Sequence, residues 1–265
     1  MNSGLAAIGA LVGVGGMTGM YFGLRDNPNG LWIALGIVVG VVVISYIVAA
    51  LTANNKFGEV MRGWLIGINA SANGFLAVTL YGKLFGDAAG LGMGIGIGLG
   101  LLNLICIFQV ITNSQVFQGI IGYLNWLMPM SWLVTVLGGV FYLLNAIGAL
   151  IGLAGVEYFK IKAMAADWKT GTFFMKGGWI SNLNPIDTAF NMGNFAFVDK
   201  NSGGTWHKEH EAGHTLNLFA FGWIFHFVGA IEENATSAGA NAYSERLAES
   251  NDSGTGGRNI PMWAS

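Results

Sequence analysis

Residues 206–231 read WHKEHEAGHTLNLFAFGWIFHFVGAI and hold all four histidines of the chain. Within this stretch, His210, Glu211 and His214 form the pattern H-E-x-x-H. On a helix, residues four positions apart stand about 40° from each other, so the two imidazoles share one face. The run from 216 to 231 is apolar nearly all round, which predicts a helix buried in protein or dipping into lipid.

The histidine pair and the glutamate between them suit a zinc ion. Neutral imidazole nitrogens are good zinc ligands, and a catalytic zinc usually takes three protein ligands and leaves one position for water. Glu211 projects about 100° further round the helix than His210, where its carboxylate can reach that water as a general base. The pattern predicts a zinc site with Glu211 as the catalytic residue. The alternative is a polar first turn whose histidines bond to backbone groups.

Composition predicts a membrane protein. Of the 265 residues, 53% are hydrophobic and only 10% are charged, against about 25% charged in soluble proteins. The net charge of −2 provides no basic surface for nucleic acid, which excludes that partner. We therefore expect a mainly α-helical, polytopic transmembrane bundle whose partner is the lipid bilayer.

Four apolar stretches have the length of a transmembrane helix, about 20 residues. They are residues 4–24, 31–51, 91–112 and 132–156. Two weaker candidates are 63–81, which carries polar side chains, and 116–130, which is short and contains Pro129 near its end. We expect residues 1–156 to form the transmembrane region. We expect the protein in the cell (inner) membrane. Lys and Arg residues follow the second and last stretches, and both groups are cytoplasmic if an even number of spans separates them, which puts both chain ends and the zinc site on the cytoplasmic side.

Glycine occupies every even position from Gly90 to Gly100, between Leu, Met and Ile. Each glycine costs a water-exposed helix about 1 kcal/mol, so this run needs a bilayer or tight packing to form a helix. It predicts close contact with another helix, within the chain or in a homo-oligomer or larger membrane complex.

The remainder of the chain carries most of the charge. We expect residues 157–250 to surround the zinc site, with at most one or two short strands, of which Phe195–Val198 is the clearest. Residues 251–265 contain several glycines and small polar residues and are expected to form a flexible tail.

A strand, a loop, an HExGH helix and a later acidic helix together resemble the core of zincin metallopeptidases. In the gluzincin branch the third zinc ligand is a glutamate on a following helix, and a carboxylate four residues later bonds a ligating histidine. This resemblance implies Glu245 as third ligand and Glu249 as its supporting carboxylate. Glu232 and Glu233 remain rival ligands, at a spacing familiar from soluble gluzincins.

Two further residues are candidates for stabilising an oxyanion in such a reaction, His226 and Tyr243. His226 lies about 120° round the helix from His214, so it cannot share the zinc unless the helix breaks, for which Gly222 is the candidate position. The other interpretation of His226 is a core residue with its hydrogen bonds satisfied.

These patterns lead to one main hypothesis, a membrane-bound zinc-dependent metallopeptidase acting on membrane or membrane-proximal protein. The alternative is a structural or pore-forming membrane subunit that assembles through the glycine-rich helix, with HExxH as a structural metal site or a vestige. A third hypothesis is a membrane-inserting toxin with a protease end.

Overall fold

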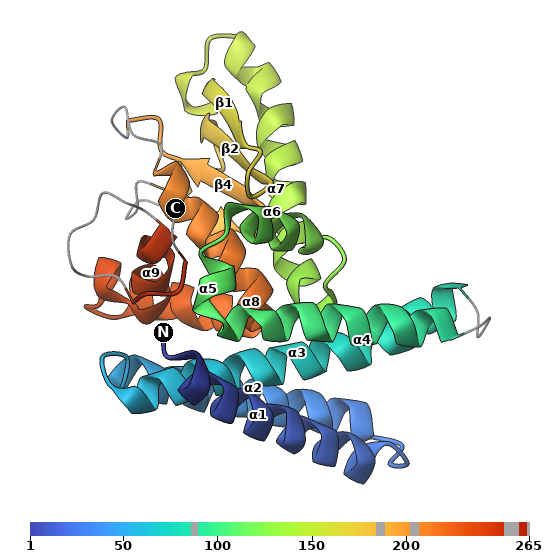
Figure 1. Ribbon diagram of the computed structural model, residues 1–265. Helices are drawn as coiled ribbons and strands as arrows, with labels where there is room; N and C mark the ends of the chain where they lie inside the picture. Colours follow the sequence, from blue (N-terminus) through green and yellow to red (C-terminus); the bar gives the residue numbers. More distant parts are fainter. Residues whose placement is uncertain (86–89, 184–188, 202–206, 252–259, 264–265) are drawn as a thin grey trace.

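The structure is a computed structural model that describes residues 1–85, 90–183, 189–201, 207–251 and 260–263. The described part is mainly helical (Figure 1). Its α-helices are α1 (Ser3–Leu24), α2 (Gly30–Leu51), α3 (Lys56–Phe85), α4 (Leu91–Leu104), α5 (Gln109–Thr112), α6 (Gln115–Leu124), α7 (Pro129–Leu153), α8 (Lys208–Ala235) and α9 (Tyr243–Ala248). Short 3₁₀ turns cover Ile105–Ile107, Glu157–Phe159, Gly239–Asn241 and Glu249–Asn251.

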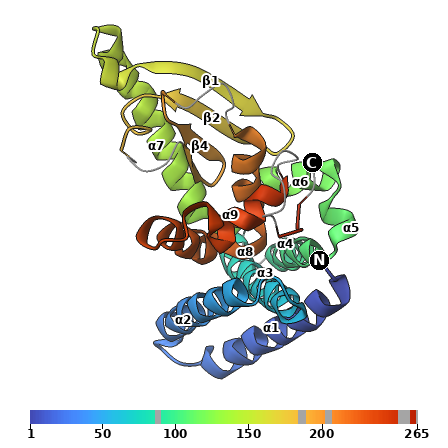
Figure 2. The same ribbon diagram turned by 90° about the vertical axis from the view of Figure 1, so that its left-hand side faces the viewer.

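Helix α8 lies at the centre of the molecule. In both Figure 1 and Figure 2, α1 and α2 form one end and a small sheet forms the other, with α8 between them. One hydrophobic core joins α1, α2 and α3 to the centre, because their buried side chains pack in the same cluster as those of α8, α9 and the chain segment at Trp263. Buried residues of the sheet belong to two smaller clusters.

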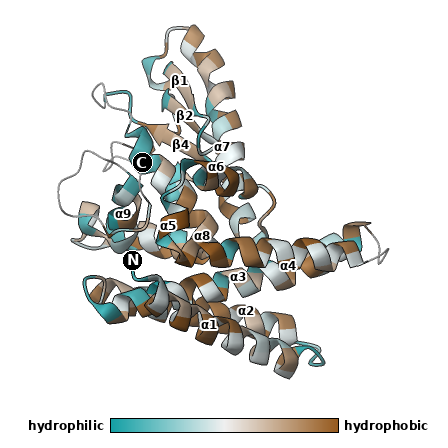
Figure 3. Ribbon diagram, in the orientation of Figure 1, coloured by the Kyte–Doolittle hydropathy of each residue, from teal (hydrophilic) through white to brown (hydrophobic). Residues whose placement is uncertain are grey.

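Among the described residues, five helices are long and apolar enough to cross a membrane, namely α1, α2, α3, α7 and α8. Hydrophobic residues prevail along α1 and α7 (Figure 3). Large apolar side chains such as Leu11, Trp32 and Leu150 are exposed on the outer faces of α1, α2 and α7. Helix α8 differs, because 72% of its most apolar stretch is buried in the protein, against 28% for α1, α2 and α7.

Residues 91–112, an expected span, do not form one continuous helix. Helix α4 ends at Leu104, and after a 3₁₀ turn the backbone is extended at Phe108 before α5 begins. An apolar run carries no signal for such a turn when it contains neither proline nor glycine at the break. The weak candidate 63–81, by contrast, belongs to the long helix α3, and 116–130 is divided between the short α6 and the start of α7 at Pro129.

The glycine-rich run packs against α3 within the same chain. A β-carbon at Gly92 would collide with the backbone of Gly82, and one at Gly96 would collide with Gly74 and Val78. These glycines therefore allow α3 and α4 to approach closely. Gly94 and Gly98 face the other way, where a β-carbon would have no neighbour within 4 Å.

Helix α8 is broken at Gly222, whose φ of 79° and ψ of 177° are not helical. At the break, the carbonyl groups of the preceding turn lack the backbone N–H donors that a continuous helix would give them. Asn69 of α3 donates its side-chain amide to Phe219 O at 2.9 Å, and Asn103 of α4 donates to the same oxygen at 2.9 Å and to Ala220 O at 3.2 Å. The polar residues of α3 and α4 thus support the broken helix.

Replacing Asn103 with leucine is expected to destabilise the fold by about 1–3 kcal/mol, the cost of leaving a buried carbonyl without its partner. The side chain is fully buried, so water cannot substitute for the amide. Denaturant unfolding in detergent measures the loss. Asn113→Leu, at an exposed position, is the matched control, and equal stability of the two variants would contradict the assigned role of Asn103.

Within the described part of the chain, four strands form one sheet in the order β1-β2-β4-β3. They are β1 (Ile161–Asp167), β2 (Thr172–Gly177), β3 (Ala189–Met192) and β4 (Phe195–Val198). Strands β2 and β4 are parallel, and the other pairs are antiparallel. The strand predicted at Phe195–Val198 is confirmed, but the expectation of at most one or two strands is wrong. Strands β1 and β3 contain several Ala, Asn and Lys residues, which have low strand propensity, so pairing with distant residues stabilises them.

The chain segment at residues 260–263 is packed into the core. Ile260, Met262 and Trp263 are almost completely buried, and Trp263 Nε1 donates to Asn217 Oδ1 of α8 at 2.7 Å. The expected flexible tail over residues 251–265 therefore does not hold for these residues. The glycine-rich part that suggested it, residues 252–259, lies outside the described residues, as do 264 and 265.

Candidate metal centre

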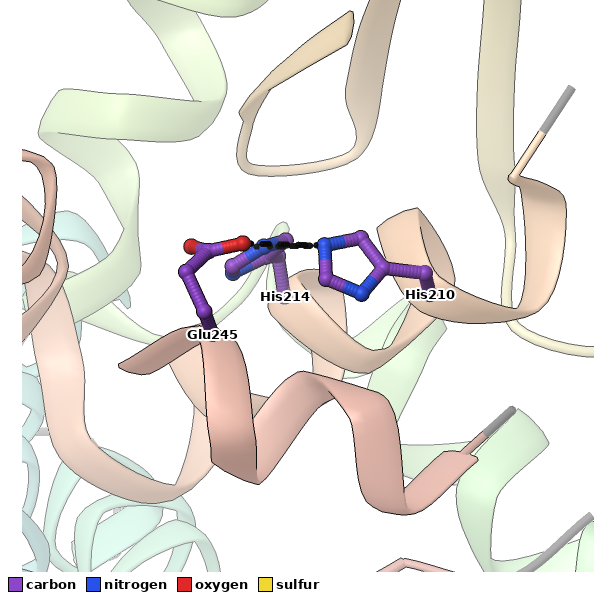
Figure 4. Close-up of side chains that lie close together, drawn as sticks. All are labelled: His210, His214 and Glu245. Carbon is purple, nitrogen blue, oxygen red and sulfur yellow. Dashed lines mark hydrogen bonds and ion pairs between the residues drawn. The ribbon is translucent and has the colours of Figure 1, made fainter. Parts of the chain in front are cut away.

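The two histidines of the HExxH pattern lie in the first turns of α8. They are four residues apart, and their Nε2 atoms approach each other to 3.1 Å. Figure 4 shows both imidazoles turned toward the same point. The shared face expected from the helical period is therefore present, and both rings are largely buried.

Glu245 reaches this point from α9. Its Oε2 lies 3.0 Å from His210 Nε2, and its Oε1 lies 3.2 Å from His214 Nε2 (Figure 4). One ligand atom from each of the three residues lies within 4.8 Å of the others. His210, His214 and Glu245 could therefore hold a metal ion, and we call them the metal group. Two imidazoles and one carboxylate form a donor set that zinc accepts.

A glycine inside the pattern brings α9 close enough. A β-carbon at Gly213 would collide with Ala248 of α9, lying 2.8 Å from its Cα. Any larger residue at this position would move α9, and with it Glu245, away from the histidines. The sequence HEAGH thus places both histidines and the contact surface for the helix that carries Glu245.

Glu249 lies where a supporting carboxylate is expected. Its Oε1 is 3.2 Å from Nδ1 of His210, the ring nitrogen that does not face the metal group. A carboxylate at this position fixes the orientation of a ligating imidazole and increases its basicity. Glu249 therefore stands next to the metal group without belonging to it.

The metal group is arranged for the ionised form of Glu245. Burial alone would raise the pKa of this carboxyl group, but the facing imidazoles of His214 and His210 outweigh burial and hold the pKa well below its usual value. A carboxyl group must lose its proton to bind a metal ion. Glu245 is therefore ready to act as a ligand at neutral pH.

Glu211 adjoins the metal group and is almost completely buried. Its Oε2 atom forms no hydrogen bond with any residue that the structure describes. A buried carboxylate oxygen without a partner is costly for a fold, so its presence needs an explanation. Glu211 lines a cavity of about 600 Å³ together with all three residues of the metal group. A water molecule or substrate in this cavity can supply the missing partner.

The rival ligands lie elsewhere. Glu232 Oε2 accepts hydrogen bonds from Tyr46 OH at 2.6 Å and from the backbone nitrogen of Tyr243 at 2.8 Å. Glu233 lines the cavity but is not one of the three residues whose ligand atoms converge. The structure therefore brings Glu245, and neither Glu232 nor Glu233, to the histidines.

The two oxyanion candidates differ in position. Tyr243 is buried beside Arg62 and does not line the cavity. His226 lines it, because the break at Gly222 changes the direction of α8, and its ring centre lies 6.3 Å from that of His214. Since the backbone oxygen of Asn191 can only accept, His226 Nε2 donates to it at 3.0 Å. The other ring nitrogen is then an acceptor in the neutral imidazole.

Sequence patterns did not indicate Asn191 of strand β3. Its amide donates to the backbone oxygen of Glu211 at 3.0 Å, while its own backbone oxygen receives the bond from His226. Asn191 therefore fixes the edge of the sheet against the start of α8. A lone asparagine in a short strand gives no signal that could have identified it.

Comparisons of the chain with protein-family models, curated proteins and solved structures give no match. The interpretation of the metal group therefore depends on its own geometry and chemistry.

Proposed function

We propose that this protein is a membrane-bound zinc metallopeptidase. The observation that carries the proposal is the convergence of His210, His214 and Glu245 beside a buried glutamate with an unpartnered oxygen, Glu211. A metal site that only stabilised the fold would need no such glutamate on its cavity. Hydrolysis needs one, because a water molecule must lose a proton as it attacks a carbonyl group.

Each residue then has a defined task. His210, His214 and Glu245 would hold the zinc ion, which lowers the pKa of a bound water molecule and polarises the scissile carbonyl. Glu211 accepts the proton of the attacking water and passes it to the leaving amine. Glu249 keeps the ring of His210 oriented.

The cavity walls support an apolar protein substrate. Besides the polar metal group, the lining includes Phe141 of α7, Phe190 of β3 and Phe227 of α8. Both α7 and α8 are among the helices apolar enough to cross a membrane. We therefore propose membrane or membrane-proximal segments as substrates, cleaved at the cytoplasmic face of the inner membrane.

Metal removal tests the proposal directly. Protein purified in detergent is expected to contain one zinc ion per chain by elemental analysis and to cleave an unfolded apolar polypeptide. A zinc chelator is expected to abolish cleavage, and one equivalent of zinc to restore it. Absence of stoichiometric metal, or cleavage that is insensitive to the chelator, would overturn the proposal.

A further inference from the structure

Helix α9 cannot hold Glu245 in place by itself. It has six residues, whereas isolated helices shorter than about 12–15 residues are marginal in water. The backbone N–H groups of a first helical turn have no partner within the helix. The residue before α9, Ala242, has no side chain that could cap them. The first turn of α9 must therefore be fixed by residues from elsewhere in the chain.

Two distant residues supply the missing acceptors. The backbone nitrogen of Tyr243 donates to Glu232 Oε2 at 2.8 Å, and that of Ser244 donates to the hydroxyl of Tyr46 at 3.1 Å. The same hydroxyl donates to Glu232 Oε2 at 2.6 Å. Tyr46, on α2, and Glu232, near the end of α8, thus form a joint cap on the first turn of α9, directly before Glu245.

The cap is held firmly. Tyr46 is almost completely buried, and its ring packs edge-to-face on that of Tyr243 at 5.5 Å between centres. Gly229 of α8 allows close approach of this turn, since a β-carbon there would collide with the side chain of Ser244 and lie 3.4 Å from the Tyr46 hydroxyl. Contacts from both α2 and α8 therefore fix the position of this turn. They also fix the direction in which the side chain of Glu245 points.

We infer that Tyr46 and Glu232 are positioning residues of the metal group, which set the place of Glu245 without touching the metal ion. This inference rests on the proposed zinc site. Glu232, which sequence spacing made a rival ligand, then has a different role, because its hydrogen bonds help to position Glu245.

Tyr46→Phe is the variant that tests this role. It keeps the buried ring and removes only the hydroxyl. Ser244 N–H then loses its acceptor, and Glu232 Oε2 keeps only the bond from the backbone nitrogen of Tyr243. We expect zinc to bind about 10–100-fold more weakly, the usual effect of losing a residue that orients a metal ligand. Peptide cleavage is expected to recover when zinc is raised to saturation. The zinc dissociation constant is measured on the full-length protein in detergent by competition with a chromophoric chelator.

Tyr81→Phe is the matched control. Its hydroxyl on α3 also donates to a partner, Leu127 O at 2.8 Å, but that partner belongs to neither α8 nor α9. A residue with a merely structural role changes the unfolding midpoint of the metal-free protein and leaves the zinc dissociation constant of the folded protein unchanged. We expect this behaviour from Tyr81→Phe only.

Glu232 provides a second, independent test. Glu232→Gln retains an oxygen acceptor and is expected to weaken zinc binding less than Glu232→Ala. Wild-type zinc affinity in both Tyr46→Phe and Glu232→Ala would overturn the inference while leaving the proposed function intact. Absence of zinc from the wild-type protein would overturn both.

Discussion

His214→Ala protein is expected to purify without stoichiometric zinc and to lack metal-dependent cleavage. The binding free energy of a zinc ion at a site with four ligands is about 10–16 kcal/mol. A single ligand therefore accounts for roughly 3–4 kcal/mol, or about 10²–10³-fold in zinc affinity. The loss should be at the upper end here, because His214 Nε2 faces both His210 and Glu245 within 3.2 Å. Elemental analysis and chelator competition measure the effect.

His207→Ala is the control for this variant. His207 is exposed at the start of α8 and is not part of the metal group, so its removal should leave one zinc ion per chain. Equal zinc content in the two variants would show that any bound ion lies outside the metal group, and would remove the basis of the proposed activity.

Glu211→Gln is expected to retain zinc and to lower the rate of peptide cleavage by about 10²–10⁴-fold, the usual contribution of a general base. Glutamine has nearly the same shape but cannot accept the proton of the attacking water. Because Glu211 is not a member of the metal group, we expect the zinc content of this variant to stay unchanged while its cleavage rate falls.

The comparison is made with Glu209→Gln, which removes a carboxylate from an exposed position two residues away. Steady-state cleavage of one fluorogenic peptide by both variants, together with their zinc content, distinguishes a catalytic role from a general charge effect. An unchanged cleavage rate in Glu211→Gln would exclude Glu211 as the base.

The part of the metal group that lies on one helix could be predicted from sequence, because the helical period alone places His210 and His214 on a common face. Which glutamate approaches the histidines depends on how two helices pack, and sequence spacing does not determine that packing. Glu232, Glu233 and Glu245 were all possible until the structure showed α9 seated against Gly213 and Glu232 engaged by Tyr46. Hydrogen bonds between residues nearly two hundred positions apart leave no local pattern.

The fold was predictable to a similar extent. Uninterrupted apolar length identified α1, α2 and α7, because lipid-facing and core-facing sides are both apolar in these helices. Apolar length did not reveal the interruption of the helix within residues 91–112, where the chain turns without a change in composition. It also failed for the sheet, in which β2 pairs in parallel with β4, since strand pairing between distant segments does not follow from local propensity.

The asparagines that support the broken helix have a consequence for how the protein is made. When α3 first meets the membrane, the amide of Asn69 opposes its partition into lipid. The carbonyl group that Asn69 later binds belongs to a residue 150 positions further along the chain. We therefore expect the insertion machinery to retain α3 until later segments are synthesised, so that biogenesis proceeds by delayed, cooperative release rather than helix by helix.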